Sequence, residues 1–134
     1  MKTKPVLSAD DVQRILDAAG AHAHQNSWQV TIAVVDDGGH LLGLRRLDGA
    51  APLTATIAPG KARISALGRR ESATYEQTIN EGRTAYLSVP MDAMLEGGVP
   101  IEVDGQVAGA VGVSGVKSTQ DVEIAKAGIA ALSS

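Results

Sequence analysis

Cysteine is absent from the 134-residue chain, and the charge balance is slightly acidic. The lack of cysteine excludes disulfides, thiolate nucleophiles, Fe–S clusters and cysteine-ligated zinc. Lys and Arg number 12 and Asp and Glu number 15, which gives a formal net charge of −3 at pH 7. Nucleic-acid binding depends on clustered Lys and Arg side chains that replace counterions, so we expect no nucleic-acid partner.

Aromatic residues are also scarce, since the chain has no phenylalanine, one tryptophan and two tyrosines. Apolar residues nevertheless make up 44% of the chain, and most of them are Ala, Val, Ile and Leu. A core built from such small side chains must bring its backbones close together. A chain of this length can bury most of its apolar surface in one core, so we expect a single domain over residues 1–134.

Long apolar runs are missing as well. No segment reaches the roughly 20 apolar residues that a membrane-spanning helix requires, so we expect no membrane partner. The N-terminal stretch, MKTKPVLSADD, has two lysines but lacks the apolar segment that follows them in a secretory signal peptide. We therefore expect a cytoplasmic location.

Four segments have the apolar spacing or the composition of helices. Ser8 and Ser118 are placed to cap the first and the last, with Asp11 and Asp121 three residues further on in capping-box positions. Pro59 lies inside the second segment, where proline removes a hydrogen bond, so we expect a kink or a break there. The predicted helices cover residues 8–26, 54–69, 72–86 and 118–132.

Two pairs of segments have the pattern of antiparallel hairpins, residues 30–35 with 41–47 and residues 99–103 with 106–114. The sequences that join them, DDGG and DG, contain residues that accommodate the positive φ of a tight turn. Hairpins place antiparallel strands side by side, and strands here do not alternate singly with helices. The pattern predicts an α+β fold with helices packed on the faces of one antiparallel sheet of about five strands.

The last predicted strand has one face made only of small side chains, those of Ala108, Ala110, Gly112 and Ser114. One interpretation is close packing of a helix, such as the last one, because glycine in strands often marks close backbone approach. The other is the wall of a ligand site. We favour helix packing and keep Ser114 as a substrate-binding residue under the second interpretation.

Three charged residues could together bind a carboxylate. Lys61 falls on the apolar side of its predicted helix, where a lysine needs a carboxylate or a ligand as its partner. Arg46 and Asp48 lie at the end of a predicted strand that the helix must approach. In this hypothesis Arg46 and Lys61 bind the substrate, while Lys61 and Asp48 serve as catalytic groups, with Asp36 as an alternative to Asp48. The alternatives are a solvated lysine and a surface Arg–Asp pair.

Three histidines are further candidates for chemistry. His22 lies at the edge of the first helix's apolar stripe, and His24 points roughly to the opposite side. The two rings diverge too far to chelate one metal ion, so we predict no metal site. A histidine in this setting is more often a packing residue than a ligand.

Four stretches of the sequence resemble the haem-binding GlcG/HbpS-like family, which also supplies the C-terminal domain of some cobalamin adenosyltransferases. The likeness covers nearly the whole chain. The blocks that carry it are VVDDGGHLLGLRRLDGA, GKARISAL, GGVPIEVDGQVAGAVGVSG and DVEIAKAGIAAL.

The resemblance implies a profilin-like fold, a homo-oligomer and, in some members, association with haem. It makes haem the expected cofactor, with His22 and the Gly97 and Gly98 of the GGVPI block as cofactor-binding residues. Two functions therefore remain open. The first is a haem-binding or haem-handling protein. The second is a module that binds a small carboxylate, or a proton-transfer enzyme of the isomerase or lyase type.

Overall fold

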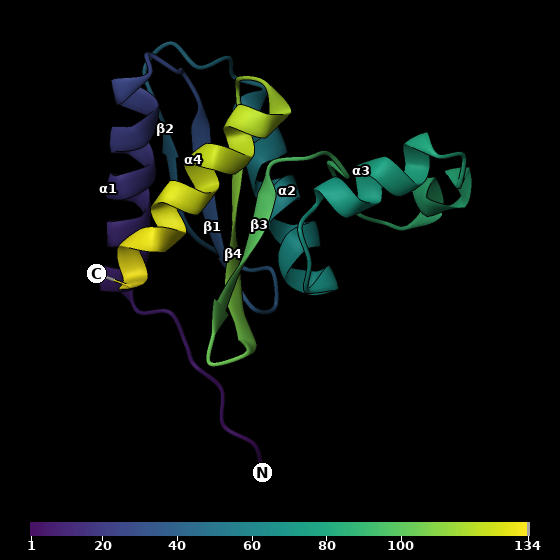
Figure 1. Ribbon diagram of the computed structural model, residues 1–134, viewed down its shortest axis with the longest axis horizontal. Coiled ribbons are helices and arrows are strands. Elements are labelled where there is room, and N and C mark those ends of the chain that lie inside the picture. The colour runs from purple at the N-terminus through teal and green to yellow at the C-terminus, as the bar shows by residue number, and fades with distance from the viewer. Residues whose placement is uncertain (134) are drawn as a thin grey trace.

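A computed structural model describes residues 1–133 of the chain and forms an α+β fold. A four-stranded sheet is combined with four α-helices and two short 3₁₀ helices (Figure 1). In chain order the elements are α1 (Ala9–Gln25), β1 (Thr31–Asp36), β2 (Leu41–Arg46), α2 (Thr54–Gly68), α3 (Ala73–Asn80), η1 (Thr84–Ser88), β3 (Gly98–Val103), β4 (Gln106–Ser114), α4 (Ser118–Ala130) and η2 (Ala131–Ser133).

The sheet has the strand order β2-β1-β4-β3, and all of its pairings are antiparallel. Both predicted hairpins are confirmed, and they join in one sheet through β1 and β4. The prediction of about five strands is wrong, because the described residues form four. The segment between α3 and β3 forms η1 and an irregular loop instead of a further strand.

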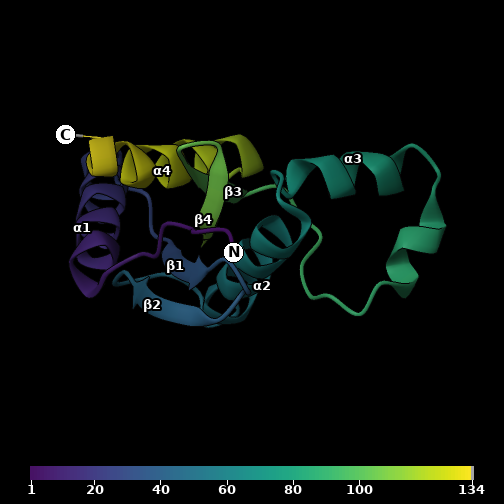
Figure 2. The same ribbon diagram turned by 90° about the horizontal axis from the view of Figure 1, so that it is seen from below.

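The two faces of the sheet are covered by different helices (Figure 2). α1 and α4 cover one face, where the larger apolar side chains gather into the main core. α2 covers the other face, where Val35 and Ala110 meet Ala62 and Ala66 in a second, smaller cluster. The residues that pack at the centre of the main core are Ile15, Ile32, Val34, Ile101, Val111, Val113 and Ile124.

A helix packs on the small face of β4, as the helix-packing interpretation predicts. That helix is α2, whereas the sequence suggested the last helix, α4. A Cβ added at Gly112 would lie 2.1 Å from the carbonyl oxygen of Ala58, so only glycine permits this approach. Ala108, predicted to lie on the small face, instead packs in the main core. The cause is an irregularity opposite Ile101 in β3, where one residue of β4 has no partner and the alternation shifts.

Helix boundaries follow the predictions at one end of the chain and depart from them at the other. Ser8 and Asp11 form the predicted capping box, with hydrogen bonds of 3.1 and 2.8 Å. At α4, however, Ser118 is the first helical residue and Lys117 is the cap, so the predicted cap is wrong. Pro59 lies inside α2 without breaking the helix.

Residues 73–95 form an arm that projects from the sheet and its helices (Figures 1 and 2). The predicted helix over residues 72–86 is shorter in the structure, since α3 ends at Asn80 and the chain continues into η1. Ser72 anchors the base of the arm, because its hydroxyl donates to the Leu95 carbonyl and accepts from the Gly98 N–H. Among the described residues, no helix has the length and apolar character needed to cross a membrane.

Candidate functional site

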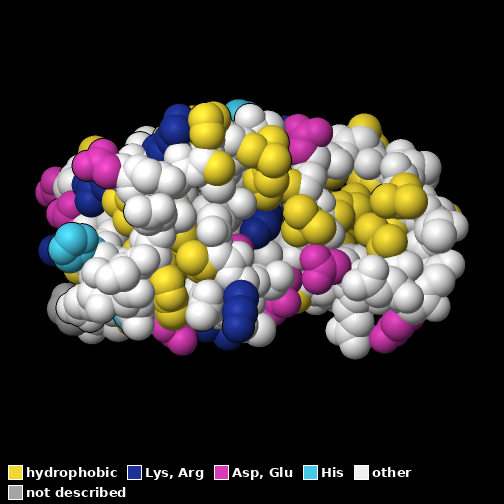
Figure 3. Space-filling view, turned by 90° about the horizontal axis from the view of Figure 1, so that it is seen from above, with side chains coloured by type: hydrophobic (Ala, Val, Ile, Leu, Met, Phe, Trp, Pro, Cys, Tyr) yellow, Lys and Arg dark blue, Asp and Glu magenta, His cyan; other side chains and the backbone are white. Residues whose placement is uncertain are grey.

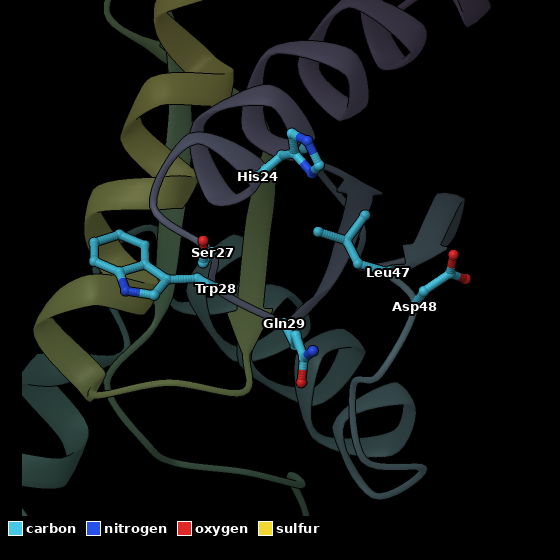
Figure 4. A pocket seen from close by; sticks show the side chains of 7 residues that line it. His24, Ser27, Trp28, Gln29, Leu47 and Asp48 are labelled. Carbon is cyan, nitrogen blue, oxygen red and sulfur yellow. The ribbon is translucent and has the colours of Figure 1, made fainter.

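A pocket of about 410 Å³ opens where the C-terminal end of α1 meets the end of β2 (Figure 4). His24 stands on one side and Leu47 and Asp48 on the other, while Trp28 turns away toward α4. This volume falls within the range of small-molecule sites. The pocket is lined by Gly20, His24, Ser27, Trp28, Gln29, Leu47 and Asp48.

Two sharp changes of chain direction build the pocket. α1 ends as the chain reverses at Ser27, which has a φ of +58°, and the Trp28 N–H then donates to the Ala23 carbonyl at 2.8 Å. On the other wall, Gly49 has a φ of +84°, and a Cβ there would lie 2.6 Å from the Gln29 side-chain amide. Glycine therefore lets Gln29 pack against the turn that carries Asp48.

Two polar side chains of the pocket lack a hydrogen-bond or ion-pair partner among the residues that the structure describes. Across residues 1–133, neither the His24 ring nor the Asp48 carboxylate makes a hydrogen bond or an ion pair, and both residues are exposed. Gly20 leaves bare backbone on the α1 wall, and the Arg45 guanidinium lies beside it, 3.5 Å from where a Cβ would stand. The pocket thus presents an imidazole, bare backbone and a nearby cation to a ligand.

His22, the haem ligand predicted from the sequence, lies in a different setting. Its Nε2 is 2.6 Å from a Glu123 carboxylate oxygen on α4, and its ring centroid is 6.0 Å from that of Trp28. One ring nitrogen is therefore committed to the contact that joins α1 to α4. Its role as a cofactor ligand stays a prediction.

Lys61 is buried in the centre of the molecule, with 4% of its surface exposed. Its ammonium donates to the Val113 carbonyl at 2.9 Å and to the Asp121 carboxylate at 3.1 Å. The second oxygen of Asp121 accepts from the Val116 N–H at 3.3 Å. Burial raises the pKa of the Asp121 carboxyl, and the charge of Lys61 opposes that rise. The pair ties α2 to α4 and to the end of β4.

The two glycines predicted to bind a cofactor surround Lys61. A Cβ added at Gly97 would lie 2.7 Å from the Lys61 ammonium nitrogen, and one at Gly98 would lie 2.2 Å from the Lys61 carbonyl oxygen. Both glycines are buried, and they make room for the lysine and its helix. Their observed contacts are with protein atoms, and cofactor binding by them stays a prediction.

The other residues predicted for carboxylate chemistry do not hydrogen-bond to the Lys61 ammonium, whose partners are Val113 and Asp121. Arg46 is exposed and its Nε donates to the Ala50 carbonyl at 3.0 Å. Asp48 lines the pocket of His24. Ser114 is buried on the α2 face of β4, opposite Thr31. The roles predicted for these residues in carboxylate chemistry remain untested.

Sequence reasoning missed the importance of two residues. Asp121 has a capping-box spacing after Ser118, which hid its buried position opposite Lys61. A lysine expected on a buried helix face was a signal that a buried carboxylate existed elsewhere in the chain. His24 had no such signal, because its pocket depends on a strand end more than 20 residues away.

Comparison with known proteins identifies the family of this chain. A family model described as haem degrading protein HbpS-like matches residues 7–130. The chain belongs to this family. Protein GlcG of Escherichia coli (strain K12) is 54% identical over 114 residues, which are 85% of each chain. The resemblance to the GlcG/HbpS-like family is therefore confirmed.

Two solved structures resemble the chain over almost all of its length. A double mutant of Streptomyces reticuli HbpS is 26% identical, with a TM-score of 0.89, and the match covers 98% of this chain and 90% of that one. A complex of PduOC with haem is 26% identical, with a TM-score of 0.85, and the match covers 95% of both chains. Family membership and these neighbours support a haem-related role.

Proposed function

We propose that this chain binds haem in the pocket between α1 and the end of β2, with His24 as the axial ligand. The observation that carries the proposal is the His24 imidazole, which lines a pocket and has no partner among residues 1–133. The family is described as haem-degrading, and a similar protein, PduOC, has been solved in complex with haem.

The residues around His24 fit the requirements of a haem group. A haem needs an accessible axial ligand, and a neutral imidazole is one of the common choices. Gly20 lines the pocket without a side chain of its own, and Leu47 offers an apolar side chain on the wall opposite His24. Arg45 lies at the Gly20 edge, where its planar guanidinium can bind a carboxylate such as a haem propionate.

Each residue then has a defined role. His24 would hold the iron through a ring nitrogen, Gly20 and Leu47 would line the ring, and Arg45 would bind a carboxylate of the group through a charge-assisted hydrogen bond. Arg45 is itself positioned by the Asp17 carboxylate at 2.9 Å and by the Leu16 carbonyl at 3.2 Å. When bound, haem supplies redox and oxygen chemistry, which the side chains of this pocket do not provide.

The test is a titration of the purified protein with haemin, followed by visible absorption. The wild-type protein is expected to shift and sharpen the Soret band, and His24→Ala is expected to abolish that change. His22→Ala and His40→Ala are matched controls that remove the other two histidines and are expected to keep the shift. A shift that survives in His24→Ala contradicts the proposed ligand. If the shift disappears in His22→Ala instead, the axial ligand is the residue predicted from the sequence.

A further inference from the structure

The turn between β1 and β2 holds the ring of His40 against the carboxylate of Asp36. The Asp36 Oδ1 accepts hydrogen bonds from the backbone N–H groups of Gly38 and His40, each at 2.9 Å. The Nδ1 of the His40 ring lies 3.1 Å from Oδ1 and 3.2 Å from Oδ2 of the same carboxylate. Gly38 gives the ring room, because a Cβ at this residue would lie only 3.0 Å from the His40 Cε1. The turn therefore folds the imidazole back onto Asp36.

The Asp36 carboxylate determines which ring nitrogen of His40 carries the proton. Burial raises the pKa of the Asp36 carboxyl, but the hydrogen bonds from His40 and Gly38 outweigh burial and hold the pKa below its ordinary value of 3.8. A charged carboxylate only accepts hydrogen bonds, so Nδ1 is the donor. In the neutral imidazole, Nε2 then carries a free electron pair. The His40 side chain is 81% exposed, and across residues 1–133 its Nε2 makes no hydrogen bond or ion pair.

The other two histidines lack this combination. The Nε2 of His22 is taken by Glu123 at 2.6 Å, and the His22 side chain is 29% exposed. His24 is exposed, but it has no carboxylate partner within residues 1–133. Exposure by itself is not distinctive, since histidine side chains are among those that reach the surface in Figure 3. Of the three histidines, His40 alone pairs a carboxylate on Nδ1 with an exposed, unpartnered Nε2.

Two cations lie at the same turn. The Lys4 ammonium is 2.8 Å from the Asp37 carboxylate, and the Arg69 guanidinium donates to the Asp37 carbonyl. Their charges balance those of Asp36 and Asp37, so the turn does not repel an anionic electrophile as two unpaired carboxylates would. A phosphoryl donor is an electrophile of this kind.

We propose that His40 is a phosphoryl-acceptor site and that Asp36 is its positioning residue. The donor is a small molecule with a labile P–N bond. The Nε2 electron pair attacks phosphorus, an N–P bond forms while the P–N bond of the donor breaks, and the amine leaves with the electron pair. The Nδ1 proton stays in its hydrogen bond to Asp36, whose charge stabilises the positive charge that develops on the ring. The inference does not depend on haem binding.

The test is incubation of the purified protein with phosphoramidate. Mass spectrometry measures the rate of phosphoryl addition at each histidine, and phosphorus NMR shows which ring nitrogen is modified. We expect addition at Nε2 of His40, at least about tenfold faster than at His22 or His24, which is the effect of one hydrogen bond to a charged group. Addition at His22 or His24 that is as fast as at His40 overturns the proposal, and so does addition at Nδ1 of His40.

Two matched variants test the part played by Asp36. Asp36→Asn keeps an oxygen that accepts from the Gly38 and His40 N–H groups but removes the charge, and we expect it to slow addition about tenfold and to weaken the preference for Nε2. Asp37→Asn removes the neighbouring carboxylate, which pairs with Lys4, and should react like the wild type. Urea denaturation checks that both variants fold, and the ranking of the three histidines in the wild type needs neither variant. Equal rates in Asp36→Asn and wild type, or equal slowing in the two variants, would show that Asp36 does not activate His40.

Discussion

Two polar sites of this molecule differ in how their charged and polar side chains are satisfied, the site around Lys61, which the sequence made a ligand-site candidate, and the His24 pocket, which it did not indicate. At the Lys61 site, both charged side chains are at least 95% buried and each charged group is hydrogen-bonded. At the His24 pocket, the imidazole and the Asp48 carboxylate are exposed and have no partner within residues 1–133. Buried polar groups must be satisfied by the fold itself, whereas exposed groups can remain free for a ligand.

The comparison teaches that a buried charge is a poor guide to a binding site when its partner lies in the same chain. The Lys61 ammonium is hydrogen-bonded to Asp121 and Val113, and it fills the space that Gly97 leaves by having no side chain. A ligand would have to displace protein atoms to reach it. We infer that the Lys61 site stabilises the fold and that the His24 pocket carries the binding function.

The largest effect is expected from Lys61→Met. Removing the ammonium leaves the Asp121 carboxylate buried without its partner, and breaking a buried pair in this way costs about 3–5 kcal/mol of the free energy of unfolding. Urea denaturation measures the loss. The control is Lys126→Met, which removes a lysine that lies 3.7 Å from Glu71 and is 58% exposed. That variant is expected to lose less than about 1 kcal/mol. Equal losses in the two variants would contradict a structural role for Lys61.

The double variant Lys61→Met/Asp121→Leu is expected to recover much of the loss. Replacing both charges with apolar side chains removes the unpaired carboxylate, and such replacements are often close to neutral. The Val116 N–H loses its acceptor, so a residual cost of about 1–2 kcal/mol remains. A double-mutant cycle in urea measures the coupling. Losses that simply add would show that the two side chains act independently.

In contrast to the Lys61 site, the His24 pocket is expected to contribute little to the free energy of unfolding. His24→Ala removes an exposed side chain without a partner, so the free energy of unfolding should change by less than about 0.5 kcal/mol. The control, His22→Ala, breaks the contact with Glu123 and the packing on Trp28, and should cost up to about 1 kcal/mol. Thermal and urea denaturation of both variants provide the comparison. A larger loss in His24→Ala than in His22→Ala would assign His24 a structural role.

The smallest effect is expected at the start of α1, the helix that carries His22 and His24. The Ser8 N–H and hydroxyl lower the pKa of the Asp11 carboxyl below its ordinary value of 3.8. The charged carboxylate therefore stabilises the fold above pH 3.8, and this contribution is lost as the pH falls through the lowered pKa. Because the site is exposed, Asp11→Ala should cost about 0.5 kcal/mol at pH 7.

The difference between wild type and Asp11→Ala is expected to vanish in urea titrations carried out well below pH 3.8. Asp10→Ala is the matched control, since Asp10 lies in the same first turn of α1 but makes no capping bond. Any pH dependence of similar size in Asp10→Ala would mean that the effect comes from charge near the helix end and not from the capping box.

Local patterns in the sequence were sufficient for both hairpins and for the first helix. The turns between the strands are specified by Asp and Gly, and Ser8 with Asp11 specifies the start of α1. The break predicted at Pro59 is wrong, because α2 runs on through it from Thr54 to Gly68 and packs on β4 at Gly112. Tertiary contacts of that kind do not appear in a local pattern.

The site was less predictable than the fold. Lys61 was identified as buried, but its partner Asp121 lies 60 residues away on another helix. The His24 pocket needs the end of α1 and the end of β2 to meet, which depends on how the helix packs across the sheet. The profilin-like character of the fold and the cofactor roles of His22, Gly97 and Gly98 remain predictions.

A crystal structure of the protein loaded with haemin tests the central claim most directly. We expect the haem iron to be bonded to a ring nitrogen of His24, with the ring near Gly20 and Leu47 and a propionate near Arg45. The same structure should retain the contact between Lys61 and Asp121. A haem bonded to His22, or one that displaces Asp121 from Lys61, would contradict the assignment of binding to one site and of stability to the other.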